Sequence, residues 1–175
     1  SRGPLQYPVE VSRVETRLVE YAVSAVGSVE AFEIVQVTAR VAGVVERVSF
    51  MEGDEVRAAG VLAEIEPKRY ALALESARAA LARAEARDSE ARAGLERRER
   101  AVAQSPVLIK GEEMESYLTG ARAAAADLAS ARTAVEKAAL DLRDARVRAP
   151  AGGVIQTRTA QTGQYVEPGD LLDTM

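Results

Sequence analysis

The sequence contains no cysteine and no histidine. Their absence excludes thiolate and imidazole metal ligands, cysteine nucleophiles and histidine general bases. The methionines Met51, Met114 and Met175 are too far apart in the sequence for a soft-metal site, and the carboxylates form no recognisable acid–base pair. We therefore expect no enzymatic activity, no metal and no cofactor.

Aromatic residues are also scarce, at 4% with no tryptophan, although hydrophobic residues make up 47%. Much of the apolar content is alanine, which lets helices approach closely but buries little area per residue, so an extended body is expected. The net charge of −4, with both signs mixed along the chain, lacks the clustered basic surface that nucleic acid selects. No apolar run is long enough to span a membrane, so any anchor of the native protein is expected outside this sequence.

Two alanine-rich segments, 67 to about 103 and 112 to about 145, carry a seven-residue repeat. One set of positions is mostly large, and a second set three residues later is mostly alanine, as in the seam of a coiled coil. The first set is Leu74, Leu81, Asp88, Leu95 and Val102, then Met114, Ala121, Leu128, Val135 and Leu142. The short connection predicts an antiparallel hairpin folded at residue 107 or 108, each helix being roughly 50 Å long.

A second repeat flanks the helices. Gly43-Val44-Val45 recurs as Gly153-Val154-Ile155, and Gly53-Asp54-Glu55-Val56 recurs as Gly163-Gln164-Tyr165-Val166. Gly60-Val61-Leu62 recurs, one residue out of step, as Gly169-Asp170-Leu171. Neither half has enough apolar area to be stable alone. The chain is therefore predicted to be α+β, with a two-helix coiled-coil hairpin inserted in a split lipoyl- or biotinyl-like β-sandwich.

These features resemble the membrane fusion proteins, or periplasmic adaptors, of tripartite export systems. The resemblance rests on the paired half-motifs and on Val147-Arg148-Ala149-Pro150-Ala151-Gly152-Gly153-Val154, which is similar to the family's signature after the second helix. It covers residues 9 to 175. The segment 23–31 resembles adaptors of resistance-nodulation-division (RND) pumps, which favours those pumps over ABC-type exporters.

The resemblance implies a structural connector in the periplasm, anchored to the inner membrane. It would link an inner-membrane RND transporter of multidrug resistance to an outer-membrane channel of the TolC type, and it would self-associate as a trimer or hexamer. The transported substrate is not implied.

The resemblance also assigns the parts of the chain. Residues 1–36, rich in β-branched side chains from Val9 to Val35, are expected to be strands of an incomplete β-barrel or membrane-proximal domain, irregularly paired or partly disordered. Residues 37–66 and 147–175 would be the two lipoyl halves, and 67–146 the hairpin.

The tip of the hairpin is the predicted docking site for the channel. The family's docking motif begins with an arginine and a leucine four residues later, for which Arg98 and Val102 stand in here, whereas Lys110 stands where the family has a serine, one residue further along. Lys cannot accept the N–H bond of a helix cap as serine does. Docking would then rely more on the apolar residues Val107, Leu108 and Ile109, which are predicted to be exposed.

Two other functions are consistent with parts of the pattern. A lipoyl or biotin carrier domain needs a modified lysine between the two halves, and Lys68 is the nearest, but it begins a helix. A cytosolic coiled-coil scaffold would explain the helices and leave the β repeats without a reason.

Overall fold

The computed structural model describes residues 3–104 and 111–175 and divides the chain into two units, residues 1–32 and 33–175. In the first unit, residues 3–32 form neither helix nor strand, and their side chains are exposed. The second unit contains nine strands and two helices in its described residues.

Residues 9–34 form no strand in the part of the chain that the structure describes, so the strands expected there are not seen, while their place in an incomplete β-barrel or membrane-proximal domain stays a prediction. The first strand, β1, is Gln36–Thr38. Val35 exchanges backbone hydrogen bonds with Met175, at 2.7 and 2.9 Å, immediately before it. β-branched residues favour a strand only where a neighbouring strand accepts and donates its backbone hydrogen bonds, and no described strand pairs with residues 9–34.

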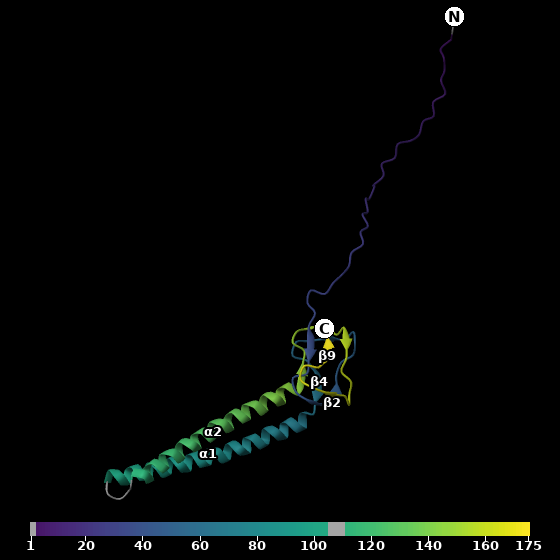
Figure 1. Ribbon diagram of the computed structural model, residues 1–175. Coiled ribbons are helices and arrows are strands. Elements are labelled where there is room, and N and C mark those ends of the chain that lie inside the picture. Colours follow the sequence, from purple (N-terminus) through teal and green to yellow (C-terminus); the bar gives the residue numbers. More distant parts are fainter. Residues whose placement is uncertain (1–2, 105–110) are drawn as a thin grey trace. The chain divides into compact units, whose positions relative to one another are not determined.

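The hairpin consists of α1 (Pro67–Gln104) and α2 (Gly111–Asp144), which lie side by side in Figure 1. Pro67 opens α1 because its missing N–H has no helical partner at that position. Every described residue of the predicted seam is buried or half-buried, and within the two helices Leu74, Ala121 and Leu128 are the most buried apolar ones of the seam. The seven-residue repeat therefore predicted the helix interface correctly.

Four strands of the β domain precede the hairpin. They are β1, β2 (Gly43–Val48), β3 (Glu55–Val56) and β4 (Val61–Ile65). Five strands follow it: β5 (Arg146–Arg148), β6 (Gly153–Val154), β7 (Thr157–Arg158), β8 (Tyr165–Val166) and β9 (Leu171–Thr174).

The two halves of the β domain interlock. The sheets have the strand orders β1-β9-β7, β5-β4-β2-β8 and β3-β6, so each sheet contains strands from both sides of the hairpin. A single core of small and branched apolar side chains fills the space between them, including Val45, Leu62, Ile65, Ile155 and Leu172. The prediction of one split β domain is confirmed.

The halves are related by an approximate twofold symmetry in which equivalent residues are 110 positions apart, as Gly53 and Gly163 are. Gly53 N–H donates to the carbonyl of Ile155 and Gly163 N–H donates to that of Val45, both at 2.8 Å. The two glycines have φ values of 88° and 87°, which few other residues adopt. Each turn is thus anchored on the other half of the domain, Gly163 on β2 and Gly53 on the residue that follows β6.

The third part of the repeat, in which the sequence matched Gly60 with Gly169, is shifted by one residue in the structure. In the structure Ala59, with φ of 63°, is equivalent to Gly169, with φ of 104°. Leu62 is equivalent to Leu172, and each side chain is 1% exposed. Matching glycine to glycine caused the error, because an alanine adopts the left-handed conformation in the first half.

Candidate functional site: the hairpin and its tip

The hairpin begins at a junction that fixes α1 to the β domain. The hydroxyl of Tyr70, in the first turns of α1, donates a hydrogen bond to the carbonyl of Ala42. Burial raises the pKa of Tyr70 above its ordinary value. The carboxylate of Glu66 accepts hydrogen bonds from Val44 N–H at 3.1 Å and from Arg69 at 2.9 Å. These contacts tie the start of α1 to the start of β2.

The seam contains one buried carboxylate, Asp88, among its described residues. It occupies a position of the seven-residue repeat that otherwise carries large apolar side chains, and it forms an ion pair with Arg92 at 2.9 Å. A carboxylate withdrawn from water is stabilised by such a partner. The pair lies within one helix, four residues apart, so α1 satisfies Asp88 without help from α2.

The register of the two helices agrees with a fold at residue 107 or 108. The guanidinium of Arg98 lies over the ring of Tyr117, 3.9 Å from its centre, which is the pairing this register requires. Near the other end, Leu74 and Leu142 line the same groove between the helices. The predicted pairing of α1 with α2 therefore holds along the hairpin.

Two of the predicted docking residues are described. Arg98 is half-buried because it covers Tyr117, a stacking arrangement in which the positive charge meets the negative face of the ring. Val102, one turn further along α1, is also half-buried. Val107, Leu108, Ile109 and Lys110 lie outside the described residues, so docking at the tip remains a prediction.

The stacking of Arg98 on Tyr117 was not predicted, although both residues had been placed in the seam. The signal was available, since the register places these two positions opposite each other and an arginine in a seam needs a polar or aromatic partner.

The described residues contain no cluster of three or more acidic residues that could hold a metal ion. Within the ranges 3–104 and 111–175, neither helix is long and apolar enough to cross a membrane.

Comparison with known proteins places the chain in a family. Residues 33–174 match the family model described as the barrel-sandwich hybrid domain of RND membrane fusion proteins. The multidrug resistance protein MdtA of Proteus mirabilis is 28% identical over 169 residues, covering 97% of this chain and 41% of that protein. MdtA of Erwinia amylovora is 32% identical over 163 residues, covering 93% and 40%. The chain thus spans about two fifths of these relatives.

Solved structures agree on the fold. A putative efflux transporter from Bacteroides eggerthii is 26% identical, with a TM-score of 0.60 over 83% of this chain and 40% of the other. ZneB from Cupriavidus metallidurans, at 23% identity and a TM-score of 0.58, covers 81% and 59% and supports the fold alone. The interlocked halves, the inserted hairpin and these matches together show that the chain belongs to the family of RND membrane fusion proteins.

Proposed function

We propose that this chain is the central part of a periplasmic adaptor that links an inner-membrane RND transporter to an outer-membrane channel of the TolC type. In this role the protein is a structural connector without catalysis, anchored to the inner membrane and self-associated as a trimer or hexamer. Because the chain spans about two fifths of the MdtA proteins, whose names record multidrug resistance, the activity of the whole protein is part of the proposal.

One observation carries the proposal. A hairpin of 38 and 34 residues leaves a β domain whose two halves are locked together around its base. At 1.5 Å per residue the tip lies roughly 50 Å along the helices from that base. A connector needs a long arm that is firmly attached to its domain. The hydrogen bonds of Tyr70 and Glu66 to the start of β2 attach the hairpin here.

An RND transporter is favoured over an ABC exporter as the inner-membrane partner. The family match is to the RND class, and the MdtA relatives support it. The carrier-domain alternative is disfavoured by the position of Lys68, which lies in the first turn of α1 where the chain enters the hairpin. A carrier lysine would instead sit on a tight turn between the two β halves.

The docking of the tip can be tested in cells with a photo-crosslinking amino acid in the full-length protein. Substitution at Val107, Leu108 or Ile109 should give adducts that contain the outer-membrane channel. Substitution at Arg83, an exposed residue in the middle of α1, is the matched control and should give none. Channel adducts that form from Arg83 and never from the tip would refute docking by the tip.

A further inference from the structure

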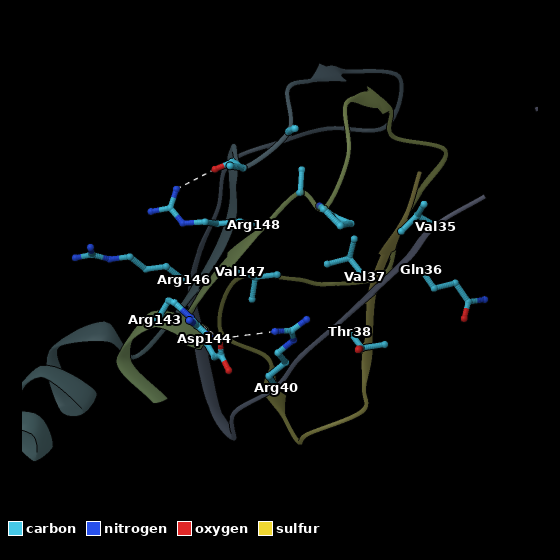
Figure 2. Close-up of a pocket in the computed structure, with 14 residues that line it drawn as sticks. Val35, Gln36, Val37, Thr38, Arg40, Arg143, Asp144, Arg146, Val147 and Arg148 are labelled. Carbon is cyan, nitrogen blue, oxygen red and sulfur yellow. Dashed lines mark hydrogen bonds and ion pairs between the residues drawn. The ribbon is translucent and has the colours of Figure 1, made fainter. Parts of the chain in front are cut away.

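An open groove lies between β1 and β5, the strands that end the three-stranded and four-stranded sheets. Figure 2 shows the groove, which has a volume of about 510 Å³. The side chains of Val37 and Val147, one from each strand, face the space between them. The groove therefore has an apolar floor between two strand edges.

The rim of the groove is cationic. Four arginines line it, and the only carboxylate among the lining residues is Asp144. Asp144 is shared between Arg143 at 3.4 Å and Arg40 at 3.9 Å, while Arg148 donates to the carbonyl of Ala59 at 2.9 Å. Arg146 is exposed and makes no ion pair with any residue in the described ranges. The groove thus carries an excess of positive charge that the domain around it does not neutralise.

The twofold symmetry shows that the fold itself does not require these arginines. Strand β5 is the equivalent of β1, and the positions of Arg146 and Arg148 correspond to Gln36 and Thr38. Both strands have the same backbone role at the edge of a sheet. Arg148 has a structural hydrogen bond to Ala59, whereas the exposed charge of Arg146 is a property of the surface and not a condition of folding.

The first half of the domain has a turn whose charged residues are all acidic. Residues 51–55 read Met-Glu-Gly-Asp-Glu and are all exposed, whereas the equivalent turn, 161–165, reads Gln-Thr-Gly-Gln-Tyr and has no charge. Glu52 accepts a hydrogen bond from Arg158 N–H, in β7, at 2.9 Å. β7 and β1 are the two opposite edges of one three-stranded sheet. None of residues 51–55 lines the groove, although Ala58 and Ala59, which follow the turn closely, do, so the turn and the groove are neighbouring but separate surfaces.

We propose that the groove between β1 and β5 binds the acidic turn 51–55 of a second copy of this chain. The charges are complementary, and Met51, which is 68% exposed, offers an apolar side chain to the valine floor. A contact between two different surfaces repeats head to tail and closes into a ring when the rotation permits. The inference rests on the self-association in the proposed function and specifies the surface that produces it.

Disulfide trapping tests the contact, because the chain has no cysteine of its own. Two differently tagged forms of the full-length protein, one with Arg146→Cys and one with Glu55→Cys, are expressed together and oxidised. They should form a mixed disulfide, and a chain with both substitutions should form a ladder of crosslinked oligomers. Arg132→Cys, at an exposed arginine of α2 that does not line the groove, replaces Arg146→Cys in the control and should form neither.

Charge reversal tests the same contact independently. Arg146→Glu should raise the concentration needed for half-maximal assembly by about tenfold or more, since like charges then face each other. Adding Glu55→Arg should restore assembly, as expected for a direct pair. Glu55 is chosen over Asp54 because the Asp54 carboxylate accepts Met51 N–H at 2.7 Å and holds the turn.

The outcomes separate the inference from the proposed function. If the protein assembles but Arg146→Cys and Glu55→Cys never join, the groove is not the interface, while self-association stands. If Arg146→Cys instead joins a different protein, the occupant proposed here is wrong. If the protein stays monomeric at all concentrations tested, the groove inference and the self-association in the proposed function both fail.

Discussion

At the scale of single residues, Asp173 is the clearest departure from the symmetry of the β domain. It occupies in β9 the position that Ala63 has in β4, and both side chains are almost fully buried. Neither carboxylate oxygen of Asp173 has a hydrogen-bond partner among the described residues. Burial raises the pKa of Asp173 from 3.8 to about 6, because the charged form has lost its water.

This carboxylate should make stability depend on pH. The folded state binds the proton more tightly than the unfolded state does, so the free energy of unfolding falls as pH rises from about 4 to about 6 and stays low above that range. A difference of about 2 pKa units corresponds to about 3 kcal/mol. Asp173→Ala should therefore raise the free energy of unfolding by up to that amount at pH 7.5, with a much smaller gain at pH 4.

Denaturant unfolding of both proteins at the two pH values measures this difference. Ala63→Asp, at the equivalent position, is the mirror control and should lower stability at pH 7.5. A gain from Asp173→Ala that is the same at pH 4 and pH 7.5 would show that ionisation of Asp173 is not the cause.

At the scale of elements, the two equivalent turns should respond alike to mutation. Gly53 and Gly163 have nearly identical positive φ values, and an added Cβ would meet no neighbouring atom at either. Alanine should cost about 1–2 kcal/mol at each position from backbone strain alone. Gly120 is the control, because it lies in α2 with open space around it, so Gly120→Ala should stabilise by up to about 1 kcal/mol.

Thermal unfolding of the three variants measures these effects. Strongly unequal losses for Gly53→Ala and Gly163→Ala would contradict the structural equivalence of the turns.

The buried Asp88 makes the hairpin less stable than its repeat allows. Arg92, the partner of Asp88, is 65% exposed, so an apolar side chain at position 88 leaves no buried charge behind and adds buried apolar area to the seam. Asp88→Leu continues the run of leucines in α1 and should raise the unfolding temperature of the hairpin, measured by circular dichroism at the helical band. Arg83→Leu, at an exposed position, is the control for added hydrophobicity. An equal rise of the unfolding temperature in this variant would show that the buried charge of Asp88 is not the cause.

The sequence predicted the elements in which apolar residues recur at a regular spacing. The seven-residue pattern identified both helices and their seam, because burial of one face recurs over many turns. Composition alone misled between Val9 and Val35, because a strand also needs a partner strand. The burial of Asp173 was not predicted. The sequence paired Gly60 with Gly169, and this shift of one residue hid the equivalence of Asp173 with the buried Ala63.

At the scale of the molecule, the interlocked topology explains how a long arm can be attached firmly. Strands β1 and β4 from the first half pair with β9 and β5 from the second, so neither half completes a sheet alone. The sequence predicted that the halves form one domain, but strand exchange between them depends on spatial pairing that no local pattern records. Docking by Arg98 and Val102 stays a prediction, and the stacking of Arg98 on Tyr117 became visible only once the two helices were paired.

The central claim is that the hairpin spans a fixed distance between two partners. Deleting residues 78–91 and 124–137 from the full-length protein removes two heptads from each helix in register, so the seam and both ends of the hairpin remain. The arm becomes about 21 Å shorter. Co-purification of the outer-membrane channel with the inner-membrane transporter through this protein measures the bridge. The account predicts a folded variant that still binds the transporter and no longer recovers the channel, whereas full recovery of the channel by the shortened hairpin would contradict it.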